Sequence, residues 1–159
     1  MRGRSWQEEV ATLFGSGYLR PAPGTWGSLA ALPPGVLLLW FGGFWGLLAG
    51  TVIATAVGIY AAAHHTRRTG TKDPSEVVID ELAGQWIALL PLGLFGEGHL
   101  WYGWIVALAL FRLFDVLKPW PCESLERLPE GWGVMCDDLM AGIYAALGMC
   151  LILLGAQHV

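Results

Sequence analysis

Long apolar stretches alternate with short clusters of charge along this chain. Residues 21–66 contain no Asp, Glu, Lys or Arg, and further apolar blocks cover residues 82–95, 100–111 and 139–155. One membrane crossing takes about 20 helical residues, so the first block is long enough for two. Residues 41–44, with the sequence FGGF, are the natural turn between them, because glycine accepts the backbone angles of a tight turn. The pattern predicts about five membrane-spanning helices.

The third and fourth blocks are too short to cross a membrane on their own. At about 1.5 Å per residue, the block at 82–95 covers only about 21 Å of a hydrocarbon core roughly 30 Å thick. We therefore expect the third helix to extend back to Pro74, with Asp73 as its N-cap, and the fourth to continue through Leu117. The charged residues on these extensions then lie at helix ends near the lipid headgroups: Asp80, Glu81, Arg112, Asp115 and Lys118.

Composition favours the same membrane interpretation. The 159 residues are enough for one domain, taken as 1–159, and 55% of them are apolar while 14% are charged; a soluble domain has about 25% charged residues. The mean hydropathy is +0.52. The net charge of −4 is spread out, so there is no basic stripe for nucleic acid. The three cysteines lack a CxxC pattern and are interpreted as free thiols.

The charges are distributed unequally between the two sides that an up-and-down arrangement creates. Every Lys and Arg falls on one side, and so does every carboxylate except Glu97. The positive-inside rule makes this side cytoplasmic. The N-terminal segment contains acidic residues and no long apolar core, so it does not resemble a cleavable signal peptide. The basic residues are Arg2, Arg4, Arg20, Arg67, Arg68, Lys72, Arg112, Lys118 and Arg127.

Three acidic clusters mark the cytoplasmic ends of the predicted helices. Asp80 and Glu81 open the third helix, Asp115 closes the fourth, and Asp137 and Asp138 open the fifth. Helix packing can bring all five together, and their mutual repulsion in a low dielectric then favours a bound divalent cation. Oxygen ligands without Cys or His favour Mg²⁺ or Mn²⁺. The alternative for any one residue is that it complements a helix dipole or a surface ion pair.

Basic and small residues complete a possible phosphate site. Asp115 and Lys118 are three residues apart on one helix face, so the first can hold a metal while the second holds a phosphate oxygen. Arg112, one turn deeper, orients Asp115 or contacts phosphate. The segment PAPGTWGS before the first helix is expected to form a turn whose backbone N–H groups and hydroxyls cradle an anion. His64 and His65 are interpreted as interfacial residues and not as metal ligands.

Four of these segments together carry a family resemblance. The blocks GTWGSLAA, VVIDELAG, FRLFDVLKPWP and GVMCDDLMAG occur in this order between residues 24 and 142. Jointly they resemble the bacterial phosphatidylglycerophosphatase A family. The family's blocks match Asp80 and Glu81; Asp115, Lys118, Pro119 and Pro121; Asp137, Asp138, Ala141 and Gly142; and Gly24, Thr25, Gly27 and Ser28.

The resemblance implies a Mg²⁺-dependent hydrolase of the bacterial inner membrane. The apolar blocks and the charge asymmetry add the expectation of several membrane passes and a cytoplasmic active site. Such an enzyme removes the terminal phosphate of phosphatidylglycerophosphate to give phosphatidylglycerol, a step of phospholipid biosynthesis. We assign metal binding to Asp80, Glu81, Asp115, Asp137 and Asp138. Catalysis is assigned to Asp80, Asp115, Lys118, Asp137 and Asp138, and phosphate binding to Gly24, Thr25, Gly27, Ser28, Arg112 and Lys118.

Several alternatives stay open at this point. The attacking group is either metal-activated water or a carboxylate that forms an aspartyl-phosphate. A small divalent-cation transporter or channel also contains intramembrane carboxylates, but here the acids cluster at one membrane face. A lipid phosphotransferase of the CDP-alcohol type requires a D-x-x-D-G-x-x-A-R signature that this sequence lacks. A soluble enzyme with an unusually apolar core is a further possibility, and the sequence leaves the oligomeric state open.

Overall fold

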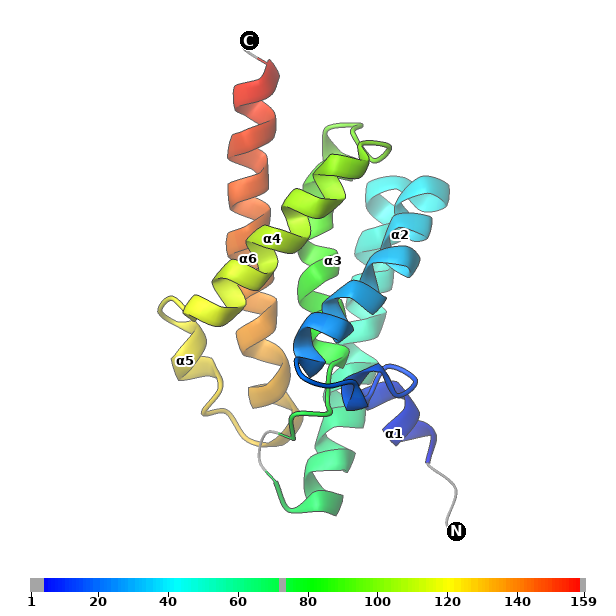
Figure 1. Ribbon diagram of the computed structural model, residues 1–159, viewed down its shortest axis with the longest axis vertical. Helices are drawn as coiled ribbons and strands as arrows, with labels where there is room; N and C mark the ends of the chain where they lie inside the picture. The colour runs from blue at the N-terminus through cyan, green and yellow to red at the C-terminus, as the bar shows by residue number, and fades with distance from the viewer. Residues whose placement is uncertain (1–4, 72–73, 158–159) are drawn as a thin grey trace.

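The computed structural model describes residues 5–71 and 74–157, which form an all-helical bundle (Figure 1). No strand occurs within these residues, so the all-α prediction is confirmed. The elements are α1 (Trp6–Ala11), the 3-10 helix η1 (Ser16–Tyr18), α2 (Pro23–Thr69), α3 (Ile79–Leu94), α4 (Trp101–Leu117), α5 (Cys122–Leu125) and α6 (Glu130–Gln157).

Helix α2 is two helical arms joined by a sharp reversal. Gly43 has φ 58° and ψ −154°, which interrupts the helix between residues 23–42, the first arm, and residues 44–69, the second arm. The arms return alongside each other, since a Cβ added at Gly50 would lie 2.7 Å from Leu38 Cδ1. The positive φ explains why glycine occupies this turn. The predicted turn at FGGF is therefore confirmed.

Two helices are long and apolar enough to cross a membrane, α2 and α6. In the most apolar window of each, only 22% of the residues are buried inside the protein. A core helix of a soluble protein would be mostly buried, whereas these helices expose large apolar side chains such as Phe41 and Leu151. Exposed apolar surface of this extent is typical of contact with a membrane or a partner. The structure thus indicates a membrane protein.

The starts of α3 and α6 differ from the predicted boundaries. Helix α3 begins at Ile79 and not at Pro74, because the Val78 N–H is bonded to the Ala11 carbonyl of the preceding segment at 2.9 Å. Helix α6 begins at Glu130, so its two aspartates lie about two turns inside the helix instead of opening it. The predicted continuation of α4 through Leu117 is confirmed. The N-cap assigned to Asp73 lies outside the described residues.

Helix α3 runs through the middle of the bundle, and glycines let its neighbours approach closely. A Cβ added at Gly84 of α3 would lie 2.6 Å from the Asp138 carbonyl oxygen of α6, and one added at Gly142 would lie 2.5 Å from the Gly84 carbonyl oxygen. Such small-residue contacts bring helix backbones together. This close packing brings the acidic start of α3 toward Asp137 and Asp138 of α6.

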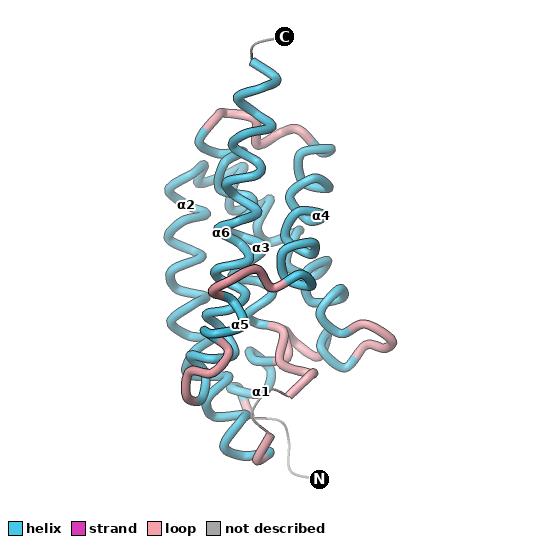
Figure 2. Tube along the Cα trace, turned by 90° about the vertical axis from the view of Figure 1, so that its left-hand side faces the viewer, coloured by secondary structure: helices cyan, strands magenta, loops and turns pink. Residues whose placement is uncertain are grey.

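The two ends of the bundle differ in charge. Figures 1 and 2 place the N-terminus, α1, the end of α2 and the start of α6 at one end, and the α2 reversal, the α3–α4 turn and the C-terminus at the other. We call the first of these the charged end. It carries Arg67 and Arg68, which lie in the last turn of α2.

Candidate active site

All five predicted carboxylates line one small cavity toward the charged end of the bundle. Its volume is about 150 Å³. Because α3 and α6 start near this end while α4 finishes there, three separate helices bring their acidic residues to the same place. The cavity is lined by Gly24, Pro74, Ser75, Val77, Asp80, Glu81, Asp115, Lys118, Glu126, Val134, Asp137 and Asp138.

Arg112 joins two of these carboxylates. Its Nη1 lies 2.6 Å from Glu81 Oε2 and 2.6 Å from Asp115 Oδ2. The Ser28 Oγ lies 2.7 Å from the same Glu81 oxygen, where its hydroxyl donates a hydrogen bond. These side chains are mostly buried, so the guanidinium offsets a repulsion between carboxylates that water would screen only weakly. One side of the acidic cluster is therefore held together by the positive charge of Arg112, which Glu81 and Asp115 share.

Gly24 permits the first turn of α2 to approach this side. A Cβ added there would lie 2.1 Å from Glu81 Oε1 and 3.1 Å from Arg112 Nη1. Any side chain at this position would push against a carboxylate that Ser28 and Arg112 hold in place. The absence of a side chain thus lets the N-terminus of α2 form part of the cavity wall.

Lys118 balances the other side of the cluster. Its Nζ lies 3.0 Å from Asp137 Oδ2 and 3.1 Å from Glu126 Oε2. Burial lowers the pKa of the ammonium, but the hydrogen bond and charge of Asp137, followed by those of Glu126, outweigh it and raise the pKa overall. Lys118 is therefore protonated. It ends α4 with φ 43°, a left-handed cap that turns its side chain back to the cavity.

Asp80 and Asp138 complete the acidic set. The Glu81 N–H donates to Asp80 Oδ1 at 2.9 Å, which fixes the Asp80 carboxylate at the start of α3. Asp138 is only 4% exposed, and the Gly84 contact holds the α6 backbone beside α3 at this point. Asp138 is accordingly the most enclosed carboxylate of the cavity among the four that are buried: Asp80, Glu81, Asp137 and Asp138.

The donor set fits a hard divalent cation, although its present arrangement is organised by Arg112 and Lys118. Among the described residues, no three His, Cys, Asp or Glu side chains form a ready-made metal cluster. One carboxylate oxygen, Asp137 Oδ1, is nevertheless buried without a hydrogen-bond partner. Oxygen-only donors with an unpaired buried oxygen suit Mg²⁺ better than Zn²⁺. The residue types therefore fit the predicted metal.

The predicted phosphate-binding segment differs in part from expectation. Residues 24–28 lie in the first turns of α2 and not in a turn before it, so that prediction of local structure was wrong. Only Gly24 lines the cavity; Thr25 is exposed, Gly27 packs against Val78, and Ser28 supports Glu81. The apolar surface of Val78 leaves room only for glycine at position 27.

Sequence reasoning missed Glu126 and the loop at residues 74–78. Glu126 lines the cavity and shares Lys118 with Asp137, while Pro74, Ser75 and Val77 form another part of its wall. Glu126 follows α5, where no apolar periodicity drew attention to it. The loop was missed because it was assigned to a helical extension, although its position directly before Asp80 was a usable signal.

Comparison with known proteins agrees with this constellation. The family model for phosphatidylglycerophosphatase A matches residues 9–153 of the chain. The chain belongs to the phosphatidylglycerophosphatase A family. It is thus a member of an enzyme family, and the resemblance found in the four sequence blocks is confirmed. No solved structure matches the chain.

Three relatives cover most of the chain. A phosphatidylglycerophosphatase A of Haemophilus influenzae is 40% identical over 87% of this chain and 83% of its own. One from Escherichia coli with the same name is 35% identical over 86% of this chain and 77% of its own. A Bacteroides thetaiotaomicron protein, whose name proposes a phosphatidylinositol-3-phosphatase, is 40% identical over 86% of both chains. All three names describe phosphatases of phosphatidyl lipids.

Proposed function

We propose that this member of the phosphatidylglycerophosphatase A family hydrolyses the terminal phosphate of phosphatidylglycerophosphate in a Mg²⁺-dependent reaction. The products are phosphatidylglycerol and inorganic phosphate. The observation that carries the proposal is the convergence of five carboxylates and Lys118 on one cavity, at one end of an apolar bundle. A phosphate monoester needs charge neutralisation and a positioned nucleophile, and a cluster of this composition supplies both.

The basic side chains and the N-terminus of α2 are suited to receive the phosphate. Lys118 lines the cavity and is protonated, so it attracts a phosphoryl oxygen. Arg112 lies beside the cavity and keeps Glu81 and Asp115 in place. Water attacks phosphorus as the ester P–O bond breaks, and the glycerol oxygen leaves as an alcohol by taking a proton that the attacking water gives up. The buried carboxylates are positioned to orient the water and to accept its proton.

The proposed Mg²⁺ would be held by Asp80, Glu81, Asp115, Asp137 and Asp138. When bound, it supplies positive charge that polarises phosphoryl oxygens and favours hydroxide over water. Asp137 would offer its Oδ1, which has no hydrogen-bond partner among the described residues, while its other oxygen stays paired with Lys118.

The proposed topology places the cavity at the level of the lipid headgroups. The two arms of α2, together with α3, α4 and α6, would give five crossings, with the charged end in the cytoplasm of a bacterial inner membrane. Helices α3 and α4 have 16 and 17 residues. At about 1.5 Å per residue they measure about 24–26 Å, less than a core of about 30 Å. Their polar ends would therefore lie just inside the interface, within reach of a headgroup phosphate.

An apolar groove farther along the first arm of α2 supports a lipid substrate. It lies between the first arm of α2 and α4, and its volume is about 370 Å³. The groove begins at Leu32, eight residues or about 12 Å beyond Gly24 of the cavity on the same helical arm. An acyl chain of a lipid whose phosphate occupies the cavity is long enough to reach this groove. The groove is lined by Leu32, Pro33, Val36, Leu37, Trp40 and Trp104.

Phosphate release by purified protein tests the proposal. We expect wild-type protein with Mg²⁺ to release phosphate from phosphatidylglycerophosphate, and Asp138→Asn to abolish release while still folding in membranes. Asn has the shape of Asp but lacks its charge, so the comparison isolates the carboxylate. The matched control is Glu97→Gln at the opposite end of the bundle, which should leave the rate unchanged. Normal turnover by Asp138→Asn would refute the acidic site.

The nature of the attacking group has its own experiment. If water attacks phosphorus directly, acid quenching during a single turnover finds no phosphoryl group on the protein. If an aspartate attacks instead, the first turnover traps an acid-stable phosphoryl group on the protein. We favour water, because Arg112 and Lys118 already engage Asp115 and Asp137.

A cation transporter is the alternative function that the acidic cluster itself raises. The described carboxylates of the cavity lie toward one end of the bundle, whereas a transport path needs polar groups near the midplane. Reconstituted liposomes separate the two functions. An enzyme releases phosphate without moving Mg²⁺ or Mn²⁺ across the bilayer, and metal flux without phosphate release would favour the transporter.

A further inference from the structure

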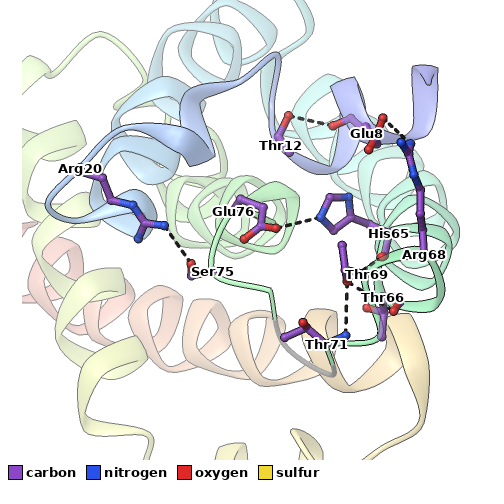
Figure 3. Close-up of polar contacts among 10 residues, drawn as sticks. All are labelled: Glu8, Thr12, Arg20, His65, Thr66, Arg68, Thr69, Thr71, Ser75 and Glu76. Carbon is purple, nitrogen blue, oxygen red and sulfur yellow. Dashed lines mark hydrogen bonds and ion pairs between the residues drawn. The ribbon is translucent and has the colours of Figure 1, made fainter. Parts of the chain in front are cut away.

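The N-terminal segment and the end of α2 both attach to the loop at residues 74–78, which we call the cavity loop. Three of its residues line the cavity, and it leads directly into Asp80 and Glu81 at the start of α3. No residue of the cavity loop is helical, so its position depends on contacts with other elements. Figure 3 shows these contacts on the side of the loop facing α1 and α2.

The first attachment is a buried side-chain pair. His65, in the last turns of α2, is only 2% exposed, and its Nε2 lies 3.2 Å from Glu76 Oε1 of the cavity loop. In Figure 3 the imidazole ring points at the Glu76 carboxylate across the space between α2 and the loop. His65 is therefore not the interfacial residue that its sequence position predicts. Burying an imidazole costs free energy unless the ring is bonded. Glu76 supplies the hydrogen bond at Nε2, whereas Nδ1 has no partner among the described residues.

The second attachment is made by backbone. The Val78 N–H at the end of the loop donates to the Ala11 carbonyl at the end of α1, with an N–O distance of 2.9 Å. Gly17 of η1 packs directly on the loop, because a Cβ added there would lie 1.9 Å from the Glu76 carbonyl oxygen. No side chain fits between the two backbones. The segment from α1 to η1 thus covers the outer side of the cavity loop.

The covering segment is in turn fixed to α2. Arg68 Nη1 lies 2.7 Å from Glu8 Oε2, and the Glu8 carboxylate also caps the start of α1 by accepting from the Ser5 N–H. On the other side of the loop, Arg20 Nη2 reaches Ser75 Oγ at 3.5 Å. Figure 3 shows the Arg20–Ser75 pair and the Glu8–Arg68 pair as separate contacts on opposite sides of Glu76. The loop is consequently held between two elements that are themselves joined.

We propose that His65, Glu76 and Gly17 are positioning residues that hold the cavity loop and, through it, the two carboxylates at the start of α3. This role rests on the proposed function. It also gives a role to the N-terminal segment, which lies before the first of the family's four sequence blocks. The loop continues without a break into the first turn of α3, so a displaced loop displaces Asp80 and Glu81. Phosphoryl transfer is sensitive to displacements of about 1 Å in its catalytic groups.

Two variants from different elements test the inference. Glu76→Ala removes the His65 contact, and Gly17→Ala forces the loop backbone away without changing any polar group. For both we expect kcat to fall about tenfold or more. The KM for the lipid should change by less than about twofold, because the apolar groove is untouched. Glu76→Gln keeps an oxygen that accepts from the imidazole, so it should restore most of kcat.

The matched control is His64→Ala. His64 is the neighbour of His65 on α2 but lines a separate cavity with Arg67 and Trp132. The His64→Ala substitution should leave kcat unchanged. Thermal unfolding of each variant in detergent shows whether a loss of activity follows from loss of the fold. Activity lost in proportion to stability in all variants would contradict a positioning role.

Hydrogen exchange supplies a measurement that does not depend on activity. We expect Glu76→Ala and Gly17→Ala to increase deuterium uptake in a peptide covering residues 74–82, while His64→Ala leaves uptake there unchanged. Unchanged uptake, or a kcat within about twofold of wild type in both variants, would overturn the inference. If wild-type protein releases no phosphate but the two variants show the expected increase in deuterium uptake, the proposed reaction is refuted and the loop attachment stands.

Discussion

Replacing Arg112 by methionine tests whether this side chain offsets the repulsion within the acidic cavity. Methionine retains much of the apolar stem but removes the charge. The Arg112 guanidinium is 2.6 Å from both Glu81 and Asp115, with 25% of its side chain exposed. Removing one partner of a fully buried pair costs about 3–5 kcal/mol. Partial solvent screening reduces this cost, and we expect Arg112→Met to lower the free energy of unfolding by about 2–3 kcal/mol.

The assay is thermal unfolding in detergent, followed by circular dichroism. For a chain of this size, a loss of about 2–3 kcal/mol lowers Tm by about 4–12 °C. The matched control is Arg127→Met, since Arg127 is 77% exposed and lies 4.0 Å from Glu123. An exposed pair of this kind contributes little, so Tm should stay within about 2 °C of wild type.

Adding Mg²⁺ extends the same test. Because the proposed metal uses the carboxylates that Arg112 neutralises, saturating Mg²⁺ should narrow the Tm difference between Arg112→Met and wild type. Equal Tm values for Arg112→Met and Arg127→Met without metal would refute the reasoning. In that case the cluster is not held together by the Arg112 charge, and the 2.6 Å contacts carry no net stabilisation.

Three further predictions address other parts of the molecule. Lys118→Ala should raise the apparent KM or lower kcat for the lipid phosphate, and unaltered kinetics would remove this ammonium from the phosphate site. Gly84→Ala should lower Tm, because its Cβ would lie 2.4 Å from Phe111 Cε2 and overpacking costs about 1–3 kcal/mol; Gly155→Ala, with open space around it, is the control. The Ser5 N–H, and then Arg68, hold the pKa of Glu8 below its usual range. That stabilisation is present above the unfolded pKa of about 4.3 and is lost as pH falls through the folded pKa. The Tm of wild type should therefore fall further than the Tm of Glu8→Gln between about pH 5 and pH 3.

Part of the fold could be predicted because it depends on local pattern. Uninterrupted apolar stretches specify helices whatever their neighbours are, and Gly43 allows the reversal within α2 wherever the arms pack. The start of α3 could not be predicted in the same way, since it is decided by a hydrogen bond between Val78 and Ala11, which are far apart in sequence.

The sequence by itself determined the helical class, the family and the set of acidic residues, because helix formation and residue chemistry are properties of short segments. Only the tertiary structure decided which charges meet. Arg112 pairs with Glu81, 31 residues earlier, and Lys118 with Asp137, 19 residues later. Only the packed helices brought His65 to Glu76 and the N-terminal segment onto the cavity loop. Pairing energies depend on distance and burial, and neither quantity exists until the helices have packed.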